Sequence, residues 1–328
     1  MNISVIGGGS WGTALVKLVS ANATHVHWWI HNNDSVEHVK KYGHNPRYIQ
    51  SLELDMQKVK PTASLKDAIN SSEIIVIATP AAFLAEVFSK AGITDLSTKK
   101  IFCAIKGMVP EYHTIPAHYF EQQLNVPHEQ MGIICGPCHA EEVALERLSY
   151  LTVASTNVSL ANQVAEHLRC RYIKTIVSDD LYGAELAAVL KNIYALGAGI
   201  AGGLGYGDNY MSVYISNCLR EMEKFVDAVH PIHRDVKSSA YLGDLLVTAY
   251  SKFSRNRTFG YMIGQGYSVK AAQLEMQMVA EGYYAVNSVI EMNKRYNVNI
   301  PIVEGIYRIL YERISATVEM RVISDLLT

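Results

Sequence analysis

Three glycines near the start of the chain have the spacing of a phosphate-binding turn. Gly7, Gly9 and Gly12 form a G-x-G-x-x-G pattern directly after the β-rich run 2–6 and before a helical run that begins at Thr13. The first glycine of such a turn allows the tight bend, the second lets the backbone approach a pyrophosphate, and the third allows close packing of helix on strand. The helix N-terminus adds free N–H groups and partial positive charge. The pattern predicts a dinucleotide-binding site.

A lysine in the second half of the chain is a candidate for proton transfer. Lys191 lies in the run 183–201, whose large apolar residues recur at helical spacing, and it shares a helix face with three alanines. Desolvation among small residues would lower the pKa of Lys191 toward the range useful for acid–base catalysis. The alternative is a lysine that snorkels from the edge of a core stripe. Asn192 and the glycine-rich run 202–209 favour the functional interpretation.

Two more polar groups of residues follow Lys191. Asp244 and Thr248 are four residues apart, which places them on one helix face. Arg255 and Asn256 offer guanidinium and amide N–H donors to a phosphate. The alternative interpretation is a basic turn on the protein surface, and this alternative is stronger for Arg257 than for Arg255.

The elements that must position these residues change character along the chain. Short β-rich runs alternate with helix-length segments in the first half, which predicts right-handed βαβ units and a doubly wound sheet with its ligand beyond the carboxyl ends of the strands. Long helices follow residue 179. We therefore expect an α/β fold, with a Rossmann-like domain over 1–179 and an all-α domain over 180–328. The expected strands are residues 2–6, 25–30, 73–78, 100–105, 131–135 and 150–154.

Composition sets the class of protein. The chain has 328 residues, 49% hydrophobic and 18% charged, which is typical of a folded globular protein of about two domains. Its 29 basic and 31 acidic residues give a net charge of −2, so no basic excess supports nucleic-acid or membrane binding, and an anionic ligand must meet a local positive cluster.

The compartment is expected to be the cytoplasm. No stretch approaches the roughly 18 to 20 consecutive apolar residues of a membrane span, and the first residues lack a charged region and a cleavage site. Five cysteines in such a length form an odd, sparse set, unlike a disulfide scaffold. We expect reduced thiols.

The choice between NAD and NADP stays open on the residues alone. An NAD site usually carries an acidic residue at the end of the second strand, whereas an NADP site carries a cation there. His31 can face a 2′-phosphate, and Asp34 lies late for a ribose contact.

The segment 135–139 reads Cys-Gly-Pro-Cys-His, which matches both a thioredoxin-type dithiol and a haem-attachment string. Haem attachment of this type belongs to exported proteins, and a thioredoxin dithiol would not lie late in a dinucleotide-binding sheet. We interpret Gly136 and Pro137 as shaping a ligand loop that carries Cys135 and Cys138.

Together these motifs resemble those of the bacterial NAD(P)-dependent glycerol-3-phosphate dehydrogenases, over nearly the whole length. The matching segments are 7–14, 106–107, 136–137, 185–192, 205–209, 243–245 and 254–260. The resemblance implies reversible reduction of dihydroxyacetone phosphate to sn-glycerol 3-phosphate with NAD(P)H, for glycerophospholipid synthesis, by a homodimer without a metal ion. His31 resembles the histidine of some NADP-using members, which favours NADPH slightly.

The resemblance also implies residue roles. Lys191 would be the proton donor, Asp244 would orient it, and Asn192 and Thr248 would complete the polar site. The implied cofactor contacts are Gly7, Gly9, Ser10, Trp11, Gly12, His31, Lys106, Ala140, Arg255, Val279 and Glu281. The implied substrate contacts are Lys106, Gly136, Cys138, Lys191, Asp244, Ser254, Arg255 and Asn256.

One departure and two rival hypotheses remain. The family usually has Ser or Thr and then an aromatic residue where this chain has Cys138 and His139, and a thiol is a weaker donor that can be oxidised. A dehydrogenase of another small hydroxy acid shares the domain layout, although Arg255 and Asn256 favour a phosphate ester. The second rival is a non-catalytic redox sensor that uses Cys135 and Cys138, in which Lys191 would have no catalytic role.

Overall fold

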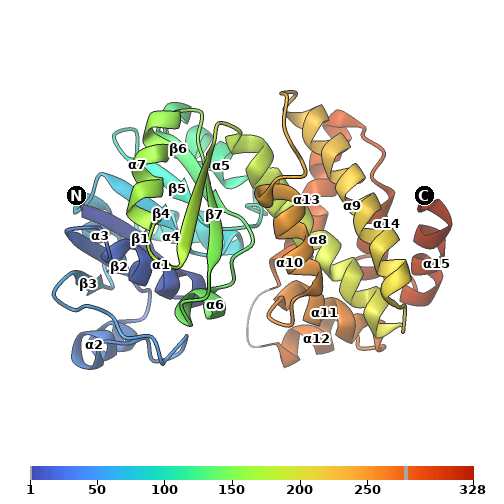
Figure 1. Ribbon diagram of the computed structural model, residues 1–328, viewed down its shortest axis with the longest axis horizontal. Helices are drawn as coiled ribbons and strands as arrows, with labels where there is room; N and C mark the ends of the chain where they lie inside the picture. Colours follow the sequence, from blue (N-terminus) through green and yellow to red (C-terminus); the bar gives the residue numbers. More distant parts are fainter. Residues whose placement is uncertain (1, 277–279) are drawn as a thin grey trace. The chain divides into compact units, whose positions relative to one another are not determined.

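The chain forms two compact units in the computed structural model, which describes residues 2–276 and 280–328 (Figure 1). The first unit holds the chain up to Ile105 and Pro116–Leu181, and the second holds Lys106–Ile115 and Tyr182–Thr328. A single division at residue 179 would leave Lys106–Ile115 in the first domain. Its contacts place it in the second unit, where Asn192 Nδ2 donates a hydrogen bond to the carbonyl oxygen of Lys106 at 2.6 Å.

The first unit is built on an eight-stranded sheet in the order β3-β2-β1-β4-β5-β6-β7-β8. Neighbouring strands are parallel except β6 and β7, which pair antiparallel, so the predicted doubly wound sheet is mostly parallel. The strands are β1 (Asn2–Ile6), β2 (His25–Trp29), β3 (Val59–Thr62), β4 (Ile74–Ile77), β5 (Lys100–Cys103), β6 (Met131–Cys135), β7 (Ser149–Ala154) and β8 (Ile173–Ser178).

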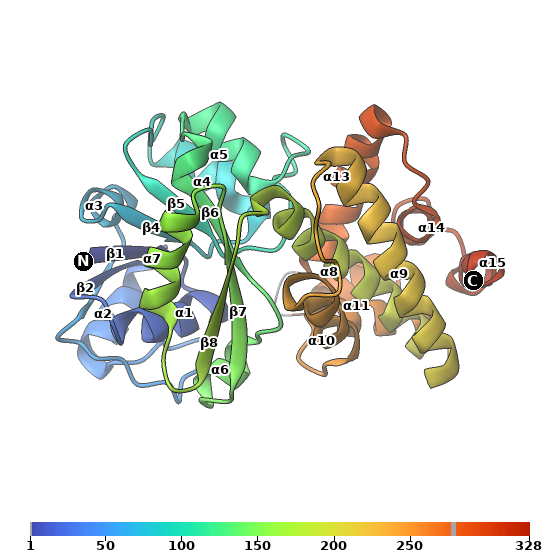
Figure 2. The same cartoon turned by 45° about the horizontal axis from the view of Figure 1, so that its top comes forward.

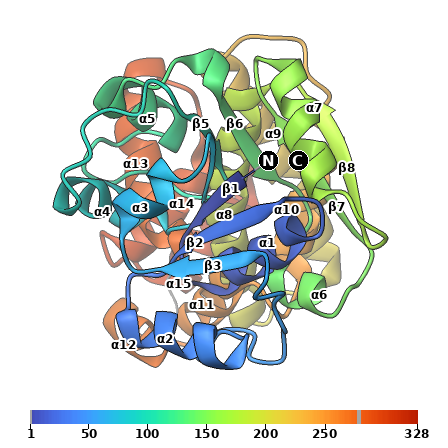
Figure 3. The same ribbon diagram turned by 90° about the vertical axis from the view of Figure 1, so that its left-hand side faces the viewer.

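Helices cover both faces of this sheet, as Figures 2 and 3 show. Helix α1 packs on β1 and β2, and α7 packs beside it on β7 and β8, while α3 packs on β1, β2 and β3. The strand order reverses between β1 and β4, so the carboxyl end of β1 opens at the point where doubly wound sheets bind their ligands. The helices of this unit are α1 (Ser10–Ser20), α2 (Asn33–Tyr42), α3 (Leu65–Asn70), α4 (Leu84–Lys90), α5 (Pro116–Leu124), α6 (Ala140–Ala144) and α7 (Val158–Leu168).

The second unit is helical around a central helix, α8, which is buried on all sides over most of its length (Figures 1 and 2). A helix that is apolar all round belongs in a core, and the others surround it. The helices of this unit are α8 (Leu181–Gly203), α9 (Asp208–Val229), α10 (Asp244–Tyr250), α11 (Arg255–Gly264), α12 (Val269–Glu275), α13 (Glu281–Tyr296), α14 (Pro301–Leu310) and α15 (Ala316–Leu326).

Helix α8 is unusually long and apolar. Within residues 2–276 and 280–328 it is the one helix whose length and composition would allow it to cross a membrane. Its most apolar 18-residue window is 94% buried inside the structure, as in a helix at the centre of a protein core. The sequence shows no unbroken apolar run here because Glu185, Lys191 and Asn192 interrupt it, and the structure shows no clear membrane span.

Two glycine pairs let α8 and α11 approach at backbone distance. Gly199 and Gly203 of α8 face Gly260 and Gly264 of α11, and a Cβ at Gly260 would lie 2.0 Å from the carbonyl oxygen of Leu196. No side chain can occupy that space without moving backbone.

The substitution Gly260→Ala is therefore expected to destabilise the protein by about 1–3 kcal/mol through overpacking, measured by urea unfolding. Gly202→Ala is the matched control on α8, because a Cβ there meets only the Tyr261 ring at 3.7 Å and alanine favours a helix. Equal stability of the two variants would contradict the close approach.

Candidate active site

The glycine turn after β1 has the shape that a dinucleotide requires. Gly7 has a φ of +137°, and its N–H donates to the carbonyl oxygen of Trp29 at 3.1 Å. A Cβ at Gly12 would lie 2.1 Å from the oxygen of Gly7, whereas a Cβ at Gly9 would meet nothing within 4 Å. The outer glycine positions are thus forced by backbone packing, and the space at Gly9 is open. These residues fit a bound pyrophosphate.

The other predicted cofactor residues of the first unit lie at the start of α1, after β2 and at the start of α6. Ser10 begins α1, and Trp11 packs on the core with its Nε1 buried without a hydrogen-bond partner. His31 follows β2 and is exposed. Ala140 is buried at the start of α6.

The loop of the Cys-Gly-Pro-Cys segment follows β6. Gly136 has a φ of +113°, and a Cβ there would lie 3.0 Å from the oxygen of Tyr150, so this turn requires glycine. Cys135 and Cys138 are buried, and none of the chain's five cysteines, all within the described residues, forms a disulfide.

A buried ion cluster lies in the second unit. Lys191 Nζ donates a hydrogen bond to Asp244 Oδ1 and a second one, of 3.0 Å, to Thr248 Oγ1. Lys106 Nζ binds the other carboxylate oxygen, Asp244 Oδ2, at 3.3 Å. The structure therefore brings together three distant parts of the sequence, which carry Lys106, Lys191 and the pair of Asp244 and Thr248.

Three elements position this cluster. The core helix α8 fixes Lys191, and α10 carries Asp244 and Thr248 one turn apart, with the Thr248 hydroxyl donating to the carbonyl oxygen of Asp244 at 2.6 Å. A π-helical turn, Ser239–Gly243, leads into α10, and such turns are frequent at functional sites. Asn192, beside Lys191, holds the backbone of Lys106.

Burial and the neighbouring charges set the protonation of the cluster. Burial lowers the pKa of Lys191 to about 7, with a further lowering from Lys106 that the attraction of Asp244 opposes. Burial by itself raises the pKa of Asp244, but Lys106 and Lys191 together outweigh it and hold that pKa below its ordinary value. A carboxylate that stays ionised beside a lysine poised near neutrality suits reversible proton transfer.

The predicted phosphate-binding residues lie at the N-terminus of α11. The Ser254 hydroxyl caps this helix by accepting from the Arg257 N–H at 3.3 Å, so the oxygen predicted to contact substrate already has a structural partner. Arg255 is exposed at the first position of the helix. Asn256 is buried, and its Oδ1 accepts from the Gly282 N–H at 3.0 Å, which leaves its amide N–H groups as the donors for a ligand.

Two more predicted cofactor residues lie later in the sequence, near Gly282, whose N–H donates to Asn256. Glu281 begins α13 and is half-buried, and Val279 lies outside the described residues.

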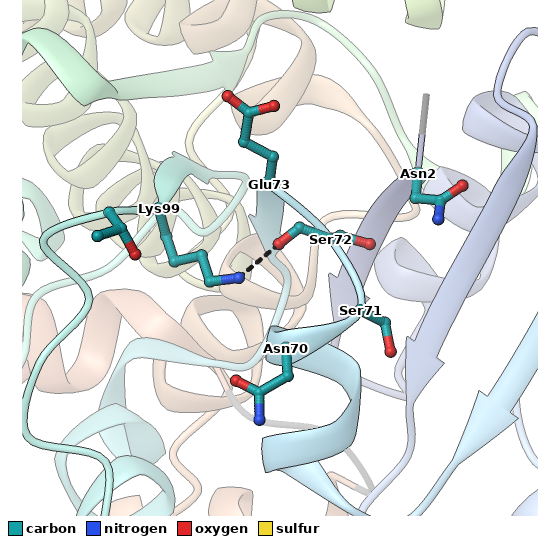
Figure 4. Close-up of a pocket in the computed structure, with 7 residues that line it drawn as sticks. Asn2, Asn70, Ser71, Ser72, Glu73 and Lys99 are labelled. Atoms are coloured by element: carbon teal, nitrogen blue, oxygen red, sulfur yellow. Dashed lines mark hydrogen bonds between the residues drawn. The ribbon is translucent and has the colours of Figure 1, made fainter.

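A pocket of about 540 Å³ lies elsewhere, at the amino ends of β1, β4 and β5 (Figure 4). Lys99 Nζ donates to the carbonyl oxygen of Ser72 there at 2.8 Å. Ligands of doubly wound sheets bind at the carboxyl ends of the strands, so this hollow is not the predicted site. Its lining residues are Asn2, Asn70, Ser71, Ser72, Glu73, Thr98 and Lys99.

Sequence reasoning missed one residue that touches the glycine turn. Asn45 is buried and bonds to the Gly8 carbonyl and to Thr13. The only local signal was the turn-forming pair Asn45-Pro46, which does not indicate a contact 37 residues away.

Comparison with known proteins decides the family. Sequence models of the N-terminal and C-terminal parts of the NAD-dependent glycerol-3-phosphate dehydrogenases match residues 2–161 and 180–321. The chain is 33% identical over 314 residues to a glycerol-3-phosphate dehydrogenase [NAD(P)+] of Staphylococcus carnosus, covering 95% of this chain and 94% of that one. The chain belongs to this family.

Solved structures agree with the assignment to the glycerol-3-phosphate dehydrogenases. The crystal structure of the Coxiella burnetii glycerol-3-phosphate dehydrogenase matches with a TM-score of 0.90 at 28% identity, covering 98% of each chain. A D-mandelate dehydrogenase with NADH matches at a TM-score of 0.64 and 16% identity over 98% of this chain and 99% of that chain, a likeness of fold alone. The family resemblance and the α/β fold class predicted from the sequence are confirmed, and the alternative of another hydroxy acid is not favoured.

Proposed function

We propose that the chain catalyses the reversible NAD(P)H-dependent reduction of dihydroxyacetone phosphate to sn-glycerol 3-phosphate, a precursor of glycerophospholipids. The observation that carries the proposal is the buried pair of Lys191 and Asp244 with Lys106 beside it. Family membership supplies the substrate, and the cluster supplies the proton that ketone reduction needs.

The chemistry follows from the protonation of Lys191. The glycine turn after β1 would hold the reduced cofactor, whose nicotinamide would supply a hydride to the carbonyl carbon of the substrate. Negative charge grows on the carbonyl oxygen, and the Lys191 ammonium stabilises it and then donates its proton. In the reverse direction neutral Lys191 accepts the proton of the hydroxyl group.

Asp244 makes this exchange reversible. It holds Lys191 through Oδ1 and Lys106 through Oδ2, so its charge stays paired with Lys106 when Lys191 becomes neutral. A buried carboxylate without a charged partner has a high free energy. Because Lys106 stays paired with Asp244, proton loss from Lys191 does not leave the carboxylate in that state.

Arg255 and the Asn256 amide are proposed to hold the substrate phosphate. Arg255→Ala is expected to raise KM for dihydroxyacetone phosphate roughly 10- to 100-fold and to change kcat little, because a charged hydrogen bond to the phosphate serves ground and transition states alike. Steady-state kinetics with varied substrate measure both constants.

Two comparisons isolate this role. Arg257→Ala removes the neighbouring arginine and should leave KM unchanged. Dihydroxyacetone lacks the phosphate, so its weak reduction should be equally slow in the Arg255→Ala variant and in the unmodified enzyme. A selective loss of activity on dihydroxyacetone would argue against phosphate binding by Arg255.

The remaining assignments complete the proposal. Residues 1–179 would bind the cofactor and 180–328, with Lys106, would bind substrate. The exposed ring of His31 suits the 2′-phosphate of NADPH, so we propose that NADPH is preferred and that NADH is also used. The absence of disulfides among the five cysteines fits a cytoplasmic enzyme, and we propose a homodimer by analogy with the family.

Loss of reduced-nicotinamide absorbance on adding dihydroxyacetone phosphate tests the reaction. Parallel samples contain NADPH or NADH, and a 2-oxo acid replaces the substrate in a control. Rapid loss with the phosphate ester is expected. Consumption only with the 2-oxo acid, or none with bound cofactor, would contradict the proposal.

A further inference from the structure

Asn45 ties the chain that follows α2 to the glycine turn. Its side chain is 2% exposed, and Nδ2 donates to the Gly8 carbonyl oxygen at 3.0 Å and to Thr13 Oγ1 at 2.8 Å. Its Oδ1 accepts from the backbone N–H groups of Arg47 at 2.9 Å and Tyr48 at 3.2 Å. Both donors and both acceptor positions of the amide are therefore used.

These bonds fix the peptide planes of the turn. Asn45 holds the carbonyl oxygen of Gly8, and that of Gly9 accepts from both the N–H and the hydroxyl of Thr13, each at 2.9 Å. In a trans peptide the N–H that follows a carbonyl points the opposite way. The N–H groups of Gly9 and Ser10 are thus turned away from Asn45 and Thr13.

We propose that Asn45, with Thr13, is a positioning residue that aims the Gly9 and Ser10 N–H groups at the cofactor pyrophosphate. The space at Gly9, where a Cβ would meet nothing within 4 Å, is where an anion can approach. This inference rests on the proposed function, because it concerns the same dinucleotide site.

Asparagine is the side chain that this place requires. Alanine would leave the Gly8 carbonyl and the N–H groups of Arg47 and Tyr48 without their buried partner. Aspartate would keep the acceptors, lose the donors, and place a negative charge beside the pyrophosphate. Both substitutions free the Gly8 peptide to rotate.

Calorimetric titration with three ligands tests the role. NADPH and ADP-ribose contain the pyrophosphate, and adenosine 2′-monophosphate lacks it. Asn45→Ala is expected to raise Kd for the first two ligands roughly 10- to 100-fold and Kd for the third less than about twofold. In steady state the same variant should raise KM for NADPH, with kcat at saturating cofactor within about threefold of the unmodified enzyme.

Matched variants separate this role from a loss of folding. Asn22 follows the C-terminal end of α1, away from the glycine turn, and its Nδ2 donates to the carbonyl oxygen of Arg169. Asn22→Ala therefore removes another bridging asparagine and should change none of the three Kd values. Thr13→Val keeps the shape and removes the hydroxyl, so it should show the Asn45→Ala ligand pattern even where Asn45→Ala does not fold. The double variant should lose less than the sum of the two effects.

The outcomes are distinct. An unmodified chain that binds none of the three ligands contradicts the proposed function and with it the inference. If the chain binds them, and both variants leave Kd for NADPH and ADP-ribose unchanged or weaken all three ligands equally, Asn45 does not position the pyrophosphate groups and only the inference fails.

Discussion

Replacing Lys191 with methionine is expected to lower kcat for dihydroxyacetone phosphate about 10²- to 10⁴-fold, the usual contribution of a general acid. Methionine keeps the length of the side chain, so the buried space on α8 stays filled and Asp244 keeps its contact with Lys106. Cofactor affinity should be unchanged, because Lys191 lies outside the glycine turn. Steady-state kinetics and NADPH titration measure the two quantities.

The control for this variant is Lys252→Met, at an exposed lysine that follows α10. It removes the same charge from the same unit and should leave kcat within about twofold, as expected for a surface substitution. A Lys191→Met enzyme with near-normal turnover would remove the proton donor from the mechanism.

The second large effect concerns pH. Burial lowers the pKa of Lys191 to about 7, and reduction needs the ammonium form. Reduction should therefore be fast below pH 7 and fall as pH rises through 7, while oxidation of glycerol 3-phosphate needs the neutral amine and should rise over the same range. Profiles of kcat/KM against pH, measured for reduction and for oxidation, test these opposite trends.

Asp244→Asn should move the profiles toward acid. The substitution removes the attraction that favours the Lys191 ammonium, while burial and the charge of Lys106 remain, and both of these lower the pKa of Lys191. Loss of an opposite charge at this range shifts a pKa by roughly 1 to 3 units. At pH 7.5 most of the reductase activity should be lost, and it should recover partly at lower pH.

Glu223→Gln, at an exposed carboxylate on α9, is the control for the charge change and should leave both profiles in place. An Asp244→Asn profile that falls in height without moving along the pH axis would show that Asp244 does not set the protonation of Lys191.

The central strands were predictable because they are buried on both faces. The run Ile74–Ile77 is apolar throughout, as parallel strands under two layers of helices are. The edge strands β3 and β8 were missed, since each has one neighbour and carries polar or proline residues, such as Lys60 and Pro61 in β3. The antiparallel pairing of β7 leaves no mark in its own sequence.

The site was predictable where its signal is local. The G-x-G-x-x-G turn follows a strand and opens a helix, and Lys191 lies among small residues on a core helix. The pairing of Lys106 with Asp244 joins residues 138 apart, and only tertiary structure brings them together. Asn45 was missed for the same reason, because its partners lie in the turn before α1.

The rate of hydride transfer in a single turnover tests the role of Lys191 as proton donor most directly. Stopped-flow absorbance would follow enzyme preloaded with NADPH and mixed with dihydroxyacetone phosphate, for the unmodified chain and for Lys191→Met. We expect the first turnover to be at least about 100-fold slower in the variant, with an absorbance amplitude that corresponds to all the NADPH bound at the start. Equal single-turnover rates would show that Lys191 gives no proton in the chemical step.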